Sequence, residues 1–178
     1  MKLVKISFIH VAVLLSLFLG ACTTAQKATA PAPAPAPVAE GDAYTGTDTV
    51  KFLADGVPDR VFFSTNKFNL TTAAVNSLNK QAAFLKANAN LNVTIEGHAD
   101  ERGTREYNLA LGEKRANVVK DYLISNGIAS NRIKVVSYGK ERPANPASSA
   151  LAWSQNRRSV TVRPVSYTHL TLPTNREV

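Results

Sequence analysis

The chain has 178 residues, of which 44% are hydrophobic and 19% charged, so its length suits one compact domain and not two ordinary ones. Its single cysteine excludes a disulfide scaffold and a multi-cysteine zinc site, and no apolar run reaches the roughly 20 residues of a membrane-spanning helix, which excludes a polytopic membrane protein. The formal net charge is +8. Without Lys2 and Lys5, which lie in a segment that we expect to be cleaved, it is 19 − 13 = +6. This modest excess is only weak evidence for a nucleic-acid partner, and we expect none.

The N-terminus has the three parts of a secretory signal peptide. A basic start, residues 1–5, precedes a short apolar stretch, residues 6–19, and small residues follow. The sequence Leu-Gly-Ala-Cys at 19–22 resembles the bacterial lipobox, in which the cysteine thiol is diacylated and becomes the mature N-terminus. A signal anchor is the alternative, but the run is short for a membrane helix. We therefore expect residues 1–21 to be a lipoprotein signal peptide and Cys22 to be lipidated.

Residues 22–58 have the composition of a tether. Ala and Pro alternate four times in residues 30–37, a pattern that favours extended polyproline II and cannot bury a core. At about 3.1 Å per residue, such a segment reaches on the order of 100 Å at most. An anchored and stiffly spaced domain is suited to meet a partner away from its membrane.

Residues 59–164 carry the patterning of one compact domain. Apolar residues recur every three or four positions in the expected helices, and they alternate with polar residues in the clearest strand, residues 91–97. In chain order the sequence predicts a strand at 61–63, a helix capped by Thr71 or Thr72, a strand at 91–97, a helix opened by Thr104 and closed by Asn126-Gly127-Ile128, a strand at 133–138, a short helix at 148–154 and a strand at 159–162. This order predicts an α+β fold, a small four-stranded mixed sheet with two long helices and one short helix packed on it.

The last residues, 165–178, do not belong to that plan. The run from Val165 to Thr174 resembles the translation of a transposon-type sequencing adapter, a frequent scar on metagenomic reading frames. We expect it to take no part in the fold. A genuine exposed extension is the alternative.

The segment between the second strand and the second long helix carries the charges of most interest. Gly97 and Gly103 bracket a loop that must turn tightly and that lets something approach the backbone. The loop leads into a helix N-terminus, whose free N–H groups favour an anionic group. Asp100 stands in the loop, and Arg115 stands on the helix next to its apolar stripe. We expect a half-buried Arg115 that seeks a planar acidic partner.

Two non-catalytic interpretations of these charges remain open. In one, Asp100 and Arg115 are structural and pair with each other or with Glu101 and Glu113. In the other, they receive a zwitterion, Asp100 taking its ammonium group while Arg115 and the helix N-terminus take its carboxylate.

Catalysis is a third and disfavoured interpretation. Glu96, His98, Asp100 and Glu101 would supply acid–base chemistry on a glycan, for which paired carboxylates are needed. These residues stand beside two arginines, no Ser or Cys lies in a recognisable nucleophile elbow, and His98-x-Asp100 is one ligand short of a zinc set. We therefore expect no enzyme, no metal site and no cofactor.

The chain closely resembles the OmpA-like peptidoglycan-binding domain family. The match runs from about Val61 to Val162. Its densest part is G-H-x-D-x-x-G at 97–103, followed by Asn108, Leu111-Gly112 and Arg115-Ala116, with support from V-S-Y-G at 136–139, Pro143 and N-R-R at 156–158. With the lipobox and the Ala–Pro tether, the chain resembles the lipid-anchored members of that family.

The resemblance implies non-covalent binding of the diaminopimelate in the peptidoglycan stem peptide, without turnover. The family's binding Asp and Arg fall on Asp100 and Arg115. The other site residues that it implies are Ser64, Thr65, Asn66, Arg102, Leu111, Ala116, Arg157 and Arg158. This chain departs from the family at positions 64 and 66, where acidic residues are usual. We expect Trp153 and His98 to be structural.

The resemblance also implies partners and a location. The partners are peptidoglycan, the outer membrane through the lipid anchor, and a periplasmic TolB-type propeller protein with other Tol proteins. The domain would face the periplasm and serve envelope integrity and cell division. Another OmpA-like envelope lipoprotein with different partners is the alternative. A flagellar stator relative is disfavoured, because that class needs a membrane helix with an ionisable residue.

Overall fold

The computed structural model describes residues 41–164. The elements are, in chain order, β1 (Phe52–Ala54), β2 (Val57–Pro58), β3 (Arg60–Phe62), α2 (Thr72–Ala87), β4 (Val93–His98), α3 (Arg105–Ser125), the 3₁₀ turn η1 (Ser130–Arg132), β5 (Ile133–Gly139), α4 (Ala150–Asn156) and β6 (Arg158–Val162). The signal peptide, Cys22, the Ala–Pro repeat and the adapter-like tail lie outside the described residues. Within the described chain, no helix is long and apolar enough to cross a membrane.

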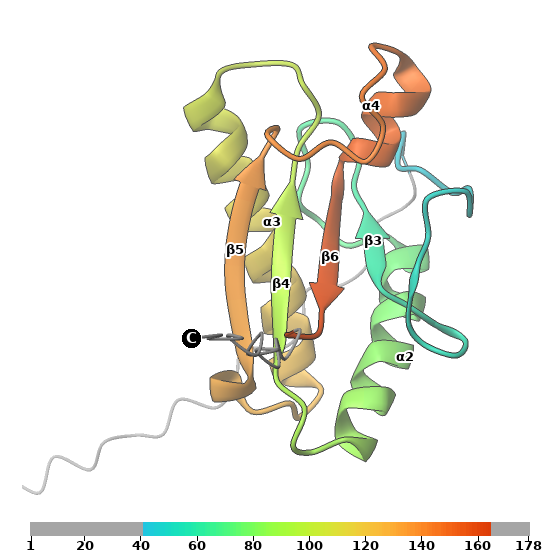
Figure 1. Cartoon of the computed structure of the whole chain (residues 1–178), viewed down its shortest axis with the longest axis vertical. Helices are drawn as coiled ribbons and strands as arrows, with labels where there is room; N and C mark the ends of the chain where they lie inside the picture. Colours follow the sequence, from blue (N-terminus) through green and yellow to red (C-terminus); the bar gives the residue numbers. More distant parts are fainter. Residues whose placement is uncertain (1–40, 165–178) are drawn as a thin grey trace, which may run out of the picture. The chain divides into compact units, whose positions relative to one another are not determined.

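Four strands form a mixed sheet in the order β3-β6-β4-β5. Strand β6 runs antiparallel to both β3 and β4, and β4 runs parallel to β5. The predicted α+β fold, with two long helices and one short helix on a small four-stranded sheet, is confirmed (Figure 1). Because of these directions, the C-terminal ends of β3, β4 and β5 meet the N-terminal end of β6 at one edge of the sheet. These strand ends lie near α4 in Figure 1. The pocket described below opens at the same end of the sheet.

Both long helices begin, and α3 ends, where the sequence predicts. Thr71 and Thr104 cap α2 and α3, and each side-chain oxygen accepts a hydrogen bond from the backbone N–H three residues later. At the other end of α3, Gly127 has φ +89° and the Ile128 N–H donates to the Leu123 carbonyl at 3.1 Å. This is the Schellman closure, in which glycine adopts the left-handed conformation without steric cost and the next apolar side chain turns into the core.

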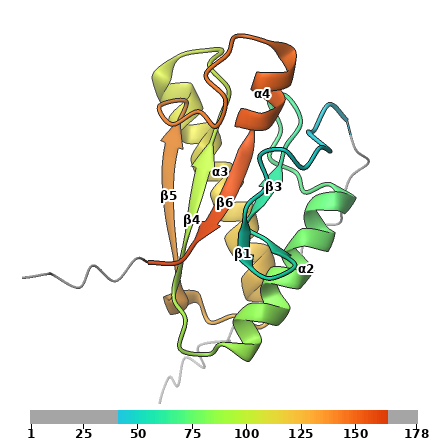
Figure 2. The same ribbon diagram turned by 45° about the vertical axis from the view of Figure 1, so that its right-hand side comes forward.

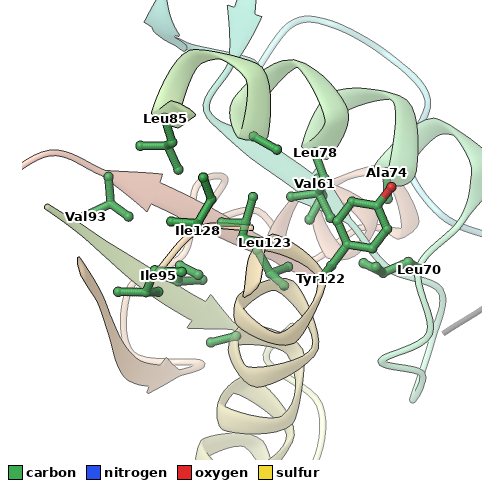
Figure 3. Close-up of a cluster of buried hydrophobic side chains, with 14 of the residues drawn as sticks. Val61, Leu70, Ala74, Leu78, Leu85, Val93, Ile95, Tyr122, Leu123 and Ile128 are labelled. Carbon is green, nitrogen blue, oxygen red and sulfur yellow. The ribbon is translucent and has the colours of Figure 1, made fainter. Parts of the chain in front are cut away.

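The core lies between α2, α3 and one face of the sheet (Figure 3). The apolar stripe that the helical spacing predicts on α3 includes Ala116, Val119 and Leu123, which are at most 1% exposed. Further core residues come from every layer and are Val61, Leu70, Ala74, Leu78, Leu85, Val93, Ile95, Tyr122 and Ile128. This packing fixes the position of α3 against β4, and therefore the position of the loop between them.

Helix α3 makes a close backbone approach to β4 immediately before that loop. A Cβ added to Gly97 would lie 1.9 Å from the Gly112 carbonyl oxygen, and one added to Gly112 would lie 3.0 Å from the Gly97 oxygen. The sequence predicted that something approaches the backbone at Gly97, and what approaches is the helix itself. Both glycines are therefore required where strand and helix touch.

We expect Gly97→Ala to lower the free energy of unfolding by about 3 kcal/mol, because the nearest atoms are backbone and cannot rotate away. Gly112→Ala should cost less, because its Cβ first meets the Ser137 Oγ, a side-chain atom that can turn. Chemical denaturation of both variants measures the difference. Equal losses, or a loss below about 1 kcal/mol for Gly97→Ala, would contradict this account.

The packed part of the chain begins earlier than the sequence predicted. Residues 41–58 were expected to belong to the tether, but β1 and β2 pair as a small hairpin on the β3 side of the domain (Figure 2). Leu53 is 3% exposed, and the Tyr44 ring meets the Phe62 ring edge-on with centroids 4.9 Å apart. The strands of this stretch have only three and two residues, too few to show a strand period, so the sequence pattern did not predict them.

Candidate functional site

A pocket of about 310 Å³ opens at the edge of the sheet where β3 and β4 end. Its walls come from the β3–α2 loop, the β4–α3 loop and the first three turns of α3. The lining residues are Thr65, Asn66, Asp100, Arg102, Gly103, Tyr107, Asn108, Leu111 and Arg115. Six of the ten peptidoglycan-site residues implied by the resemblance therefore lie around one pocket.

Asp100 is 7% exposed and is held by Arg102. The Arg102 Nη2 donates to Asp100 Oδ2 at 2.7 Å, and the Arg102 Nε and backbone N donate to Oδ1 at 3.2 and 3.1 Å. The Arg157 Nη1 lies 3.5 Å from Oδ2. Burial raises the pKa of Asp100, but the hydrogen bonds from Arg102 and the charges of Arg102 and Arg157 outweigh it and hold the pKa below its usual value. Asp100 is therefore a carboxylate at neutral pH.

Arg115 is completely buried, whereas the sequence predicted half burial and an acidic partner. Its Nε, Nη1 and Nη2 donate to the backbone carbonyls of Lys67, His98 and Ser64 at 2.9, 2.9 and 3.2 Å. These bonds use three of the five N–H groups of a guanidinium. Burial and the nearby Arg157 lower the pKa of Arg115 to about 10, so the group stays protonated at neutral pH. Its carbonyl partners neutralise no charge, so a full positive charge remains at the pocket wall.

The specific pairings of the structural interpretation are not present among the described residues. Among the described residues, Asp100 forms ion pairs with Arg102 and Arg157, and no ion pair joins it to Arg115. Glu101 instead accepts hydrogen bonds from Trp153 Nε1 at 2.8 Å and Ser148 Oγ at 3.0 Å. Asp100 and Arg115 thus present opposite charges to one pocket without neutralising each other.

Trp153, predicted as a packing anchor of the short helix, also supports the pocket. The Arg102 guanidinium carbon lies 4.4 Å from the centre of the Trp153 ring, a cation–π distance. With one side on this ring and the other on Asp100, Arg102 is fixed although 43% of its side chain is exposed.

Three lining residues were not among the predicted site residues: Gly103, Tyr107 and Asn108. The Tyr107 hydroxyl donates to Asn66 Oδ1, and the Asn108 Nδ2 donates to the Arg102 carbonyl at 2.8 Å. The helical spacing could have predicted Tyr107 and Asn108, because residues 104, 107, 108, 111 and 115 share one face of α3.

The other predicted site residues lie away from the pocket lining. Arg157 stands behind Asp100 and donates from Nε to the Phe63 carbonyl at 3.0 Å. Ser64 contributes the carbonyl that Arg115 binds, and Ala116 is fully buried in the core. Arg158 does not line the pocket either, and its Nη2 donates to the Arg142 carbonyl at 3.1 Å.

The four residues of the catalytic interpretation do not gather at the pocket, since only Asp100 lines it. Glu96 and His98 lie on the face of β4 opposite to the one that Gly97 turns toward α3, and His98 Nε2 stands 3.6 Å from Glu96 Oε2. Burial and the charges of Arg158, Arg60 and Arg142 lower the pKa of His98 to about 3. His98 is thus neutral and 1% exposed. Within residues 41–164, no three His, Cys, Asp or Glu residues cluster as metal ligands.

Comparison with known proteins places this geometry in a family. The OmpA family matches residues 62–157. The peptidoglycan-associated lipoprotein of Rhizobium meliloti is 42% identical over 154 residues, which are 86% of this chain and 86% of that protein. The protein of the same name from Mesorhizobium japonicum is 50% identical over 105 residues, 59% of this chain and 62% of that protein.

Solved structures agree with these matches. The crystal structure of the peptidoglycan-associated lipoprotein from Burkholderia pseudomallei has 36% sequence identity and a TM-score of 0.58, over 60% of this chain and 90% of that one. The C-terminal domain of Helicobacter pylori MotB, at 19% identity and a TM-score of 0.57 over 61% of this chain and 86% of that one, is similar in fold alone. The predicted resemblance is confirmed. The chain belongs to the OmpA family.

Proposed function

We propose that this chain is a lipid-anchored envelope protein whose domain binds peptidoglycan non-covalently through the diaminopimelate of the stem peptide. The observation that carries the proposal is the pair Asp100 and Arg115, a carboxylate and a guanidinium that border the same 310 Å³ pocket without pairing. The free end of diaminopimelate carries an ammonium group and a carboxylate on one carbon. Asp100 would take the ammonium group, and Arg115 would take the carboxylate with its two remaining N–H groups.

The charge balance around the pocket supports an anionic group in the ligand. Three guanidinium groups, those of Arg102, Arg115 and Arg157, surround the site. They face two carboxylates, Asp100 and Asp42, so one positive charge is left over. A buried positive charge without an acidic partner favours a ligand that brings a carboxylate.

Binding without turnover is part of the proposal. The pKa of Asp100 is held low, so this residue is a poor proton donor, and neither Glu96 nor His98 lines the pocket. Relatives that cover most of the chain bear the name lipoprotein and not the name of an enzyme. We therefore propose a binding protein that holds the wall and does not cut it.

The proposed location and protein partners follow from the family resemblance. We propose an outer-membrane anchor on Cys22, a domain that faces the periplasm, and a TolB-type protein with other Tol proteins as partners in envelope integrity and cell division. An OmpA-like lipoprotein with different partners would share the wall-binding pocket but would not retain a TolB-type protein in a pull-down.

Co-sedimentation with purified sacculi, followed by analysis of the supernatant, tests the function. We expect the full mature chain to sediment with diaminopimelate-containing sacculi and to release no muropeptides. Release of soluble muropeptides would indicate a lytic enzyme. Failure to sediment would contradict wall binding.

We expect Cys22 to carry acyl groups, because residues 19–22 match a lipobox and Cys22 is the one cysteine of the chain. The intact mass of the mature protein from its native host should exceed that of the chain from residue 22 by the acyl groups. Cys22→Ser should either remain an unprocessed precursor or be soluble, because it lacks the acyl chains that a stable lipid anchor needs. A free thiol on Cys22 in the native protein would contradict this prediction.

A further inference from the structure

Asp42, in the segment that leads from the tether into the domain, contacts the wall of the pocket. Its Oδ1 accepts a hydrogen bond from the Thr65 backbone N at 2.8 Å, and its Oδ2 accepts one from the Thr65 hydroxyl. The Arg157 Nη2 donates to the Asp42 carbonyl oxygen at 2.6 Å and lies 3.2 Å from Oδ2. The carboxylate of Asp42 therefore joins two elements that are far apart in sequence, the β3–α2 loop and the start of β6.

Both partners of Asp42 are connected to Asp100, Thr65 through Arg102 and Arg157 by its own contact. The Thr65 Oγ1 accepts from Arg102 Nη2 at 3.4 Å, and the same Nη2 donates to Asp100 Oδ2 at 2.7 Å. On the other side, Arg157 places its Nη1 3.5 Å from that Oδ2. Asp42 thus closes a ring of contacts through Thr65, Arg102, Asp100 and Arg157.

The wall itself has no carboxylate of its own. Residues 64–67 read Ser-Thr-Asn-Lys. None of these side chains is a hydrogen-bond acceptor as strong as an ionised carboxylate. Burial raises the pKa of Asp42, but the hydrogen bonds from Thr65 and the charge of Arg157 outweigh burial and hold the pKa below its usual value. Asp42 is therefore ionised at neutral pH. Asp42 brings to this wall the negative charge that its sequence lacks.

We propose that Asp42 is a positioning residue that couples the tether to the pocket. While Asp42 is seated on Thr65 and Arg157, the wall and Asp100 stay in the arrangement that receives the ligand. When the tether draws Asp42 away, the wall loosens and the domain holds peptidoglycan less tightly. The inference rests on the proposed wall binding.

The position of Asp42 also sets the length of chain between the expected lipid anchor and the pocket. Only 42 − 22 = 20 residues separate Asp42 from Cys22. A chain of this length spans at most about 70 Å when fully extended. Unseating Asp42 would release the residues that follow it and lengthen the tether, at the cost of affinity for the wall.

The test is calorimetry of the full mature chain, in detergent micelles, with a soluble muropeptide that contains diaminopimelate. We expect Asp42→Ala to weaken binding about tenfold, since the wall loses charge-assisted hydrogen bonds that hold it in place. Asp42→Asn should fall between wild type and Asp42→Ala, because its amide oxygen still accepts from Thr65 but carries no charge toward Arg157. The melting temperature should stay within about 2 °C of wild type, because the Asp42 side chain is 55% exposed.

Asp48→Ala is the matched control. Asp48 lies in the same exposed segment, and its carboxylate contacts the Tyr44 hydroxyl at 3.1 Å and not the pocket. It should bind within twofold of wild type. If wild type binds and the affinity of Asp42→Ala is within twofold of it, the coupling is overturned and the proposed function stands. Tighter binding by Asp42→Ala would also overturn it, since Asp42 would then compete with the ligand. A wild type that does not bind overturns both.

Discussion

We expect Asp100→Asn to weaken binding of a diaminopimelate-containing muropeptide by about 30-fold to several thousand-fold, or about 2–5 kcal/mol. The amide has the shape of the carboxylate but not its charge, so the ammonium group of the ligand would be desolvated without a counter-charge. Asp100 can receive it although Arg102 is already bound, because each carboxylate oxygen accepts more than one hydrogen bond. Calorimetry measures the affinity, and circular dichroism checks that the variant is folded.

The matched control for this substitution is Glu141→Gln. Glu141 is exposed and its Oε1 lies 3.3 Å from Arg105 Nε, an ion pair at the surface, where such pairs contribute little. The control should bind like wild type. If Asp100→Asn binds within about threefold of wild type, below about 0.7 kcal/mol, Asp100 is a structural residue and the proposed role of the pair is wrong.

We expect Arg115→Lys to weaken the same interaction by about 30-fold or more, although it preserves the positive charge. An ammonium group has three donors and no planar fork, so it cannot satisfy the carbonyls of Ser64, Lys67 and His98 and also bind a carboxylate. A carbonyl left without a partner in the interior costs about 1–3 kcal/mol, so the free energy of unfolding should fall as well. Calorimetry and chemical denaturation measure the two effects separately.

Arg105→Lys makes the same chemical change at a site that should not matter. Arg105 lies on the first turn of the same helix and 68% of its side chain is exposed. Neither affinity nor stability should change for this variant. If Arg115→Lys lost stability but bound normally, Arg115 would serve the fold and not the ligand.

The fold was largely predictable because its signals are local. Thr71 and Thr104 have the side chains of helix caps, Gly127 stands where the left-handed conformation ends α3, and the stripe through Val119 and Leu123 has the helical period. Each signal depends on a few neighbouring residues. The order of the elements then left few arrangements for a four-stranded sheet.

The hairpin β1–β2 and the seat of Asp42 were not predictable in this way. They depend on single contacts between residues far apart in sequence, such as Asp42 with Thr65 and Arg157, and no period or motif marks them. Sequence reasoning therefore placed the start of the domain near Asp59, whereas Leu53, which precedes it, is already packed and only 3% exposed.

Six of the nine residues that line the pocket were named from the sequence, but their bonding was not predictable. Asp100 and Arg115 were identified, yet the depth of Arg115 and its carbonyl partners follow from the contact between Gly97 and Gly112, which brings α3 against β4. The role of Trp153 in holding Arg102 depends on α4 folding over the β4–α3 loop. Contacts of this kind, between elements that are far apart in the chain, leave no pattern in a single sequence.

The most direct test of the central claim compares two muropeptides that differ at one residue of the stem peptide, diaminopimelate or lysine. Lysine has the ammonium group but not the second carboxylate, so Arg115 and the N-terminal turn of α3 would have no anion to bind. Calorimetry of the full mature chain should give binding to the diaminopimelate form and affinity at least about 30-fold lower for the lysine form. Affinities within about threefold of each other would contradict recognition of a zwitterion by Asp100 and Arg115.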